Sequence, residues 1–254
     1  MSVRDFYDGL ASDYHLVYDD WAASSQQQAS ALDGIIREHH PTATDVLDCS
    51  CGIGTQALGL ARLGYRVVGT DISERSLERA RTEAASHGID VTFAVCDFRD
   101  LTPIPGSFDV VISCDNAIPH LLTDEDLVRA FRAMRSKLRP GGLLVISVRD
   151  YDKALRERPV TAPPIISHGP PRQVLVRLHD WDAPNSPMYT VHLLVLTEDQ
   201  QGWSVADHSA RYRALKRDAI TEAAYGAGFI QVTWYTADQI GYHQPVMSAR
   251  NGPT

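Results

Sequence analysis

The sequence has few of the features that mark secreted, membrane-bound or nucleic-acid-binding proteins. Its 254 residues contain four cysteines, no basic start followed by an apolar run, and no apolar run of membrane-spanning length. There are 24 Lys and Arg against 32 Asp and Glu, which gives a formal net charge of −8. An acidic chain is poorly suited to neutralising a phosphate backbone. We therefore expect a cytoplasmic protein that acts on a small molecule and binds neither nucleic acid nor membrane, with homo-oligomer formation left open.

The four cysteines do not form a metal or redox motif. Cys49 and Cys51 are one residue apart, which is not the spacing of a zinc or disulfide-exchange pair, and Cys96 and Cys114 provide no second pair. We expect buried thiols in a reducing compartment. No metal is expected, because the chain lacks a cluster of carboxylates and histidines suited to one.

Strands and helices alternate up to about Val148, which predicts an α/β fold. Five short apolar runs are separated by segments whose apolar residues recur with helical spacing. This order is typical of a Rossmann-like, doubly wound sheet. The segments QVTWY and PVMSAR near the C-terminus predict a final strand pair, which brings the sheet to seven strands.

The pattern changes after Val148. The segment PVTAPPIISHGPP is too rich in proline for regular structure, whereas QVLVRLHDW, MYTVHLLVL and WSVADHSARYR alternate with a period of two. These three runs predict an inserted antiparallel β lid. We expect a single domain with an N-terminal helical cap at 1–40, a core at 41–150, the lid at 151–213, and a C-terminal helix and strand pair at 214–254.

The most informative stretch is VLDCSCGIGT, where a strand meets a helix through a glycine turn. Gly52 and Gly54 allow the backbone to approach a ligand closely, and Asp71, which ends the next strand, suits the two hydroxyls of a ribose. Asp48 stands before the glycines, where a carboxylate would repel a pyrophosphate but suit a cationic ligand. The alternative is a dehydrogenase loop that uses Gly52, Gly54 and Ala57.

VLDCSCGIGT is similar to the first motif of class I S-adenosylmethionine-dependent methyltransferases, with Ser50 where that family often has glycine. The resemblance implies S-adenosylmethionine as cofactor and S-adenosylhomocysteine as product. It also implies that Asp97 accepts from the adenine amino group and that Phe98 covers the ring. The alternatives are a loop aspartate and a core phenylalanine, and Asp71 could cap a helix instead. The predicted cofactor contacts are Tyr14, Trp21, Asp48, Cys49, Gly52, Gly54, Asp71, Ile72, Asp97, Phe98, Cys114 and Asp115.

The N-terminal segment FYDGLASDYHLVYDDW places Tyr7, Tyr14, Tyr18 and Trp21 on about one face of a predicted helix. An aromatic stripe of this kind either packs into the core or presents π density to a sulfonium or ammonium group. Both interpretations stay open. In the second, Tyr14 and Trp21 lie at the cofactor and Tyr18 lies nearer the acceptor.

Two further strand ends resemble glycine N-methyltransferases, namely ISCDNAIPHLL and VISVRDYD. The resemblance implies that Asn116 orients an acceptor amine and that Arg149 binds an acceptor carboxylate, for which a planar guanidinium is well suited. His120 or Tyr18 would then take the ammonium proton.

For Arg149 the alternative is a surface ion pair with Asp150 or Asp152. We expect methyl transfer to the nitrogen of an amino acid or of another amine that carries a carboxylate. The alternatives are O- or C-methylation of a larger natural product enclosed by the lid, and a non-catalytic protein that binds S-adenosylmethionine.

Overall fold

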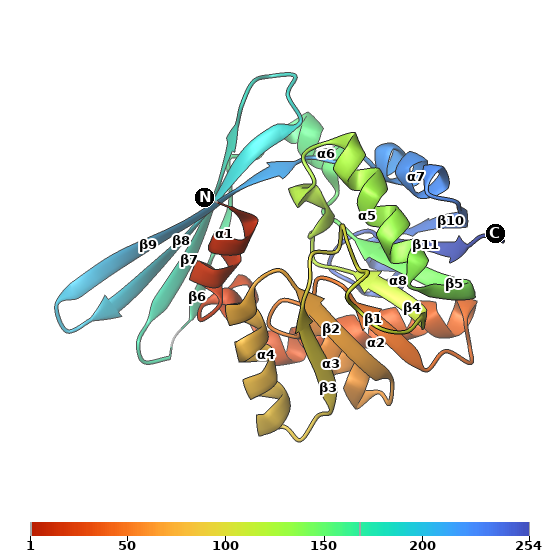
Figure 1. Ribbon diagram of the computed structural model, residues 1–254. Helices are drawn as coiled ribbons and strands as arrows, with labels where there is room; N and C mark the ends of the chain where they lie inside the picture. The colour runs from red at the N-terminus through yellow and green to blue at the C-terminus, as the bar shows by residue number, and fades with distance from the viewer. Residues whose placement is uncertain (1, 168, 254) are drawn as a thin grey trace.

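A computed structural model describes residues 2–167 and 169–253, which form two β-sheets with helices packed around the larger one (Figure 1). The larger sheet has seven strands in the order β10-β11-β5-β4-β1-β2-β3. Strands β1 to β5 run parallel, and β11 is antiparallel to both of its neighbours. The predicted doubly wound α/β fold is therefore confirmed. The strands are β1 (Asp45–Asp48), β2 (Arg66–Asp71), β3 (Val91–Val95), β4 (Phe108–Ser113), β5 (Leu138–Ser147), β10 (Phe229–Tyr235) and β11 (Val246–Asn251).

Helices cover both faces of this sheet, which explains why its central strands are apolar runs without alternation. All six residues of β4 are buried. On one face Val110 and Ile112 pack in a cluster with Leu32, and on the other Val111 packs with Phe131. The helices are α2 (Trp21–His39), α3 (Thr55–Arg62), α4 (Glu74–Ser86), α5 (Asp124–Ser136) and α7 (Arg217–Gly226).

The order of the sheet also determines where a ligand can bind. β1 pairs with β2 on one side and with β4 on the other, so the chain reverses its winding direction at β1. Ligands in open α/β sheets bind beyond the carboxyl ends of the strands at such a point. The strand ends that meet there are Asp48, Asp71 and Ser113.

The lid is a second antiparallel sheet of four strands, in the order β6-β7-β8-β9, preceded by α6 (Tyr151–Glu157). The prediction of three lid strands is wrong by one, because part of the proline-rich segment forms β6. Pro163 and Pro164 fall where the register between β6 and β7 shifts. Because β6 is also an edge strand, the N–H that each proline lacks interrupts no backbone hydrogen bonding between strands. The lid strands are β6 (Thr161–Ser167), β7 (Gln173–Trp181), β8 (Met188–Asp199) and β9 (Gly202–Arg213).

The N-terminal segment lies between the lid and the larger sheet (Figure 1). The prediction of one continuous helical face is wrong, because α1 (Val3–Leu10) is followed by the 3₁₀ turn η1 (Tyr14–Val17) before α2 begins. Tyr18 is extended and Asp20 caps α2 by accepting from Ala23 N–H. Packing still groups three of the four predicted aromatics, since the rings of Tyr7 and Tyr14 are 6.0 Å apart and those of Tyr14 and Tyr18 are 6.3 Å apart.

Two short elements complete the fold, η2 (Ile118–His120) after β4 and α8 (Ala237–Ile240) before β11.

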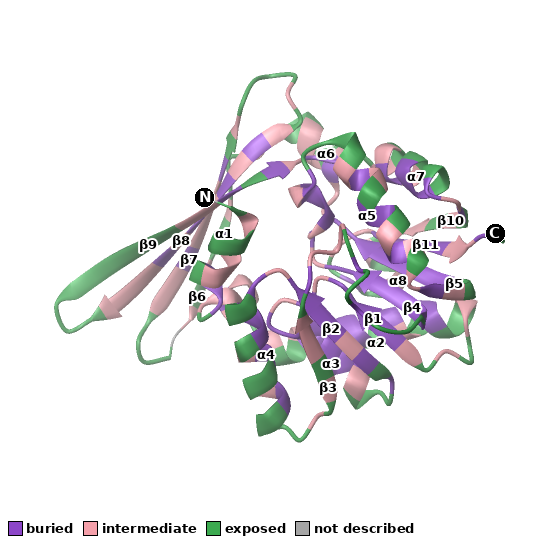
Figure 2. Ribbon diagram, in the orientation of Figure 1, coloured by how far each residue is buried: buried purple, intermediate pink, exposed green. Residues whose placement is uncertain are grey.

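Burial is uneven between the two sheets (Figure 2). The last six residues of β5 are all buried, whereas the first six of β9 are all exposed. Among residues 2–167 and 169–253, no helix is long and apolar enough to cross a membrane.

Candidate active site

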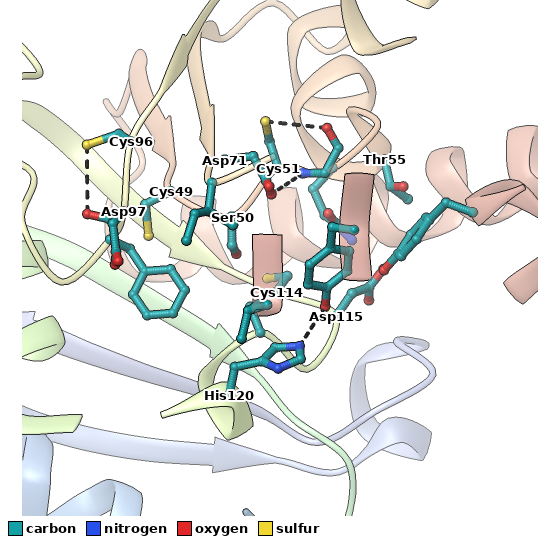
Figure 3. Close-up of a pocket in the computed structure, with 18 of the residues that line it drawn as sticks. Cys49, Ser50, Cys51, Thr55, Asp71, Cys96, Asp97, Cys114, Asp115 and His120 are labelled. Carbon is teal, nitrogen blue, oxygen red and sulfur yellow. Dashed lines mark hydrogen bonds between the residues drawn. The ribbon is translucent and has the colours of Figure 1, made fainter. Parts of the chain in front are cut away.

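Two adjoining cavities lie at the carboxyl ends of the parallel strands. The strand-end cavity is lined by residues that follow β1 to β4, and Figure 3 shows Asp71, Asp97, Asp115 and His120 around it. The lid cavity, with a volume of about 500 Å³, lies between these strand ends and β7 to β9. Tyr7, Tyr14, Tyr18 and Asp115 line both cavities. One bound molecule in each cavity would therefore meet the other at these residues.

The two glycines after β1 have different structural roles. Gly52 lines the strand-end cavity at φ +53°, and a Cβ built on it meets no atom within 4 Å. Gly54 has φ +93° and begins α3, and a Cβ there would lie 3.0 Å from Leu58 and 3.4 Å from Ala80. Gly52 therefore leaves open space beside the cavity, whereas Gly54 allows the helix to pack. Of the two, only Gly52 is part of the cavity wall.

Asp71 ends β2 and lines the strand-end cavity. Its carboxylate accepts from Gly52 N–H at 2.8 Å and from Ser73 N–H at 2.9 Å, so it connects the glycine loop to the start of α4. Ser73 itself caps α4 by accepting from Ser76 N–H. Each Asp71 oxygen has a second lone pair, which leaves both able to accept from a ligand hydroxyl. Burial raises the pKa of Asp71 above its usual value, although these N–H groups oppose the shift.

Asp97 and Phe98 both line the strand-end cavity, beyond β3. The Asp97 carboxylate is already occupied by Arg99, which donates to both of its oxygens through Nε and Nη2. Burial acts to raise the pKa of Asp97, but the Arg99 hydrogen bonds hold it below its usual value. Asp97 would therefore meet a ligand as an ionised group that is largely paired.

Two predicted cofactor contacts lie behind the cavity wall. Asp48 is fully buried, accepts from Ser50 N–H at 3.3 Å, and has an unpartnered Oδ2. Burial raises its pKa to about 8, so at neutral pH it is mainly uncharged and cannot act as the carboxylate expected to repel a pyrophosphate. Trp21 donates to Thr55 Oγ1 at 2.9 Å and supports the wall from outside. Of the predicted cofactor contacts, Asp48, Gly54 and Trp21 do not line the strand-end cavity.

The cysteines are free thiols packed around the strand ends. All four line the strand-end cavity, whereas only Cys49 and Cys114 were predicted there. Burial raises the pKa of all four, so they remain protonated, which agrees with unreactive thiols.

Asp115 and Asn116 follow β4 in an unusual backbone conformation. Their φ angles are +56° and +70°, in the left-handed region that non-glycine residues seldom occupy, and strain of this kind concentrates at functional sites. Ser147 on β5 holds the pair, because its hydroxyl accepts from Asp115 N–H and its carbonyl accepts from Asn116 N–H. The turn directs the Asp115 carboxylate toward both cavities.

The Asp115 carboxylate collects three partners from distant parts of the chain. Tyr18 and Tyr242 donate to it through their hydroxyls, and His243 Nε2 lies 3.2 Å from Oδ1. Burial acts to raise the pKa of Asp115, but His243 and Tyr18 lower it overall. Asp115 therefore stays ionised at neutral pH. Sequence reasoning missed Tyr242 and His243, since nothing local connects them to the end of β4.

His120 lies in the strand-end cavity at the end of η2. Its Nε2 is 2.9 Å from the Tyr7 hydroxyl and its ring is 4.1 Å from that of Tyr212 on β9, while Nδ1 is buried and unpartnered. Burial lowers the pKa of His120 to about 4, so the imidazole is neutral at pH 7.

Asn116 and Arg149 lie in the lid cavity, apart from His120. Asn116 Oδ1 accepts from Arg149 N–H at 3.1 Å and thus holds the chain after β5. Arg149 does not pair with its neighbours, because Asp150 and Asp152 both pair with Arg217. The alternative of a surface ion pair for Arg149 is wrong.

The site contains no grouping typical of a metal centre in the part of the chain that the structure describes, where no three His, Cys, Asp or Glu side chains converge.

The match to a known family falls within the core of the chain. Residues 46–142 match the family model of a methyltransferase domain. The chain is 31% identical over 152 residues to a putative methyltransferase, YqeM, of Bacillus subtilis, a match that covers 58% of this chain and 57% of that one. It is 31% identical over 137 residues to the glycine/sarcosine N-methyltransferase of Parasynechococcus marenigrum, covering 54% of this chain and 48% of the relative. The chain therefore spans about half the length of the curated relatives it matches.

Two solved structures share the fold over nearly the whole chain. Streptomyces venezuelae DesVI superposes with a TM-score of 0.77 at 21% identity, covering 100% of this chain and 99% of that one. CalS10 of Micromonospora echinaspora, an amino pentose methyltransferase solved with S-adenosylmethionine bound, superposes with a TM-score of 0.76 at 20% identity, covering 94% and 95%. Residues 46–142 are therefore a methyltransferase domain, and the shared fold of the whole chain agrees with the resemblance of the strand-end motifs to class I S-adenosylmethionine-dependent methyltransferases.

Proposed function

We propose that this protein transfers the methyl group of S-adenosylmethionine to the amine nitrogen of a small acceptor held in the lid cavity. The observation that carries the proposal is the Asp115 carboxylate, which borders both cavities and stays ionised. A carboxylate at this junction attracts an ammonium group and accepts its N–H. It would therefore hold an amine beside the methyl donor.

The lining of the strand-end cavity suits the chemistry of the cofactor. Gly52 leaves room for a ligand beside the loop, and both oxygens of Asp71 can accept from ribose hydroxyls. S-adenosylmethionine supplies a methyl group on a sulfonium, which is an excellent leaving group, so no strong base is needed. The task of the residues is to position the nitrogen and exclude water.

The nitrogen must be neutral when it attacks. Its lone pair forms the new bond to the methyl carbon while the carbon–sulfur bond breaks and the electron pair stays on sulfur. The acceptor ammonium would lose its proton to water before the attack, and His120, which is neutral at pH 7, adds no positive charge to the strand-end cavity that would oppose a cationic methyl donor. Tyr18, which donates to Asp115, would hold that carboxylate in place while the product becomes cationic.

An amino acid or another carboxylate-bearing amine is the first choice of acceptor. Arg149 lines the lid cavity and has no carboxylate partner among the described residues, so it is available to bind one. A second candidate is a larger natural product methylated on oxygen or carbon. The size of the lid cavity favours it, because about 500 Å³ lies within the range of pockets that take drug-sized molecules.

The test is a methyl-transfer screen over amino acids, amino sugars, amines and phenols, read by mass spectrometry. We expect N-methylated products, and Asp115→Asn should lower kcat/KM for the amine by about thirtyfold or more, as expected when a buried charge pair loses one partner. Asp100→Asn, a loop carboxylate outside both cavities, is the matched control. A folded Asp115→Asn protein with unchanged kcat/KM would contradict the proposal. Methylation of phenols alone would favour the second candidate.

A further inference from the structure

A positively charged side chain lies on the inner face of the lid. Arg177 is the central residue of β7, and side chains on one face of a strand alternate, so it shares its face with Leu175 and His179. Its partner in the sheet register is Leu193 on β8, which is buried. Apolar and aromatic residues such as Val191 surround Arg177 and His179 on this face, which also carries His208 on β9, the register partner of Leu193, and Gln173 at the start of β7.

Arg177 has no counter-charge among residues 2–167 and 169–253. No hydrogen bond or ion pair of its guanidinium is present there, yet none of its nitrogens is sealed from solvent. These nitrogens therefore open into the lid cavity, which Arg177 lines. β7 is an interior strand, so this charge does not protect an exposed sheet edge.

Arg149 faces the same space and is held in position by His179. Arg149 Nη1 lies 3.0 Å from His179 Nε2, and His179 Nδ1 lies 3.1 Å from the Pro159 carbonyl oxygen. The carbonyl can only accept, so Nδ1 carries the proton and Nε2 accepts from Arg149. This assignment requires a neutral imidazole, and burial together with Arg149 lowers the pKa of His179 to about 4.

Two like charges, Arg149 and Arg177, line the same cavity. Burial and the nearby Arg149 lower the pKa of Arg177 to about 10, so the side chain remains charged at pH 7. A cation on an apolar face with a second cation near it is unfavourable unless an anion completes the group. The lid cavity is thus positive at β7 and negative at Asp115.

We propose that Arg177 and Arg149 form a two-guanidinium oxyanion site, positioned by His179, which binds an anionic group of the acceptor. The inference rests on the proposed function and deepens it, because it assigns the acceptor to the zwitterions, with an amine at Asp115 and a carboxylate or phosphate at the lid. A carboxylate and a phosphate each present two oxygens that one guanidinium can bind through two parallel hydrogen bonds.

The first test measures anion binding alone. Protein saturated with S-adenosylhomocysteine is titrated with sodium acetate or inorganic phosphate at constant ionic strength, and the thermal unfolding midpoint is recorded. We expect a saturable rise with at least one anion, and the preferred anion separates a carboxylate site from a phosphate site. Arg177→Gln and Arg149→Gln should each raise the half-saturating concentration at least tenfold. Arg172→Gln, whose side chain pairs with Glu198 on the surface, should leave it unchanged.

The absence of a saturable rise with either anion, or an equal rise in Arg177→Gln, would overturn the inference. Arg177→Met provides a separate readout in the absence of anion. Removing an unpartnered charge from an apolar face should raise the unfolding midpoint, whereas an arginine with a purely structural role would lower it when removed. A lowered midpoint would therefore count against the oxyanion site.

The second test separates this inference from the proposed function. With an anionic amine acceptor, Arg177→Gln should raise KM at least tenfold while kcat and the affinity for S-adenosylhomocysteine change little. Efficient methylation of uncharged amines, equal in wild type and Arg177→Gln, would overturn the oxyanion site and leave the proposed function standing. Arginine-dependent anion binding without methylation of any acceptor would overturn the proposed function and leave the oxyanion site standing.

Discussion

The strand-end cavity and the lid cavity are built in different ways. In the strand-end cavity, backbone N–H groups and strand-end acids form the wall, as where Gly52 and Ser73 donate to Asp71. In the lid cavity, long side chains from separate elements meet, as Arg149 after β5 meets His179 on β7. The first is determined by short loops of a rigid sheet, and the second by how a lid packs over it. A core of the first kind can serve one cofactor while the lid changes the acceptor.

Burial supports this contrast. β4 beneath the strand-end cavity is buried along its whole length, whereas β9 begins with six exposed residues (Figure 2). Lids that open and close are drawn from the less stable parts of a fold. We therefore expect changes at the strand ends to act on cofactor affinity, and changes in the lid to act on the acceptor.

The largest effect should come from Gly54→Val. A side chain at φ +93° costs about 1 to 2 kcal/mol in the left-handed region, and contact with Leu58 and Ala80 adds about 1 to 3 kcal/mol. The loop must move, so calorimetry should show loss of S-adenosylhomocysteine binding. Gly64→Val is the matched control, because Gly64 has φ +95° but open space around it. Normal binding of S-adenosylhomocysteine by folded Gly54→Val would contradict the contrast between the two cavities, because the glycine loop would then not need the positive φ of Gly54.

Asp71→Ala should have the next largest effect. It leaves ribose hydroxyls without an acceptor, at a cost of about 1.5 to 3 kcal/mol for hydrogen bonds to a charged group. The affinity for S-adenosylhomocysteine should fall by about tenfold to a hundredfold. Asp97→Ala should weaken binding less, because Arg99 already occupies that carboxylate. The reverse order would place the main cofactor contact at β3 instead of β2.

His120 lines the strand-end cavity, and its protonation should affect the stability of the fold. Its folded pKa is about 4, while an unfolded histidine titrates near pH 6.5. Between these values the unfolded chain binds the extra proton, so this contribution is complete above pH 6.5 and is lost as the pH falls toward 4. In His120→Gln the free energy of unfolding should depend less on pH, by about 1.4 kcal/mol per unit in that window. The exposed His87→Gln serves as control, and equal slopes in both variants would contradict burial of His120.

Trp21→Phe should have the smallest effect. It removes the hydrogen bond to Thr55 Oγ1 but no side chain from the cavity wall. We expect a loss of about 0.5 to 1.5 kcal/mol in unfolding free energy and less than a fivefold change in affinity for S-adenosylhomocysteine. Chemical denaturation measures the change in unfolding free energy, and calorimetry measures the change in affinity. A loss of binding larger than that of Asp71→Ala would restore Trp21 as a direct contact.

The larger sheet could be predicted from the sequence because its signals are local. Short apolar runs, each followed by an acid or a glycine turn, mark the buried parallel strands, and the structure confirms the seven-stranded sheet. The N-terminal helix was predicted wrongly, because aromatic spacing alone does not reveal the break at η1. β6 was missed because prolines suggest a loop, while an edge strand with a register shift tolerates them.

The sequence by itself determined much of the lining of the strand-end cavity. Gly52, Asp71 and Asp97 stand at fixed distances from strand ends, and parallel strands bring their carboxyl ends to one edge. Only the tertiary structure decided that Asp48 is buried, that Asp115 accepts from Tyr242, and that Arg177 and Arg149 line one cavity. The physical reason is that burial and charge depend on which distant segments pack together, and no local spacing records that packing.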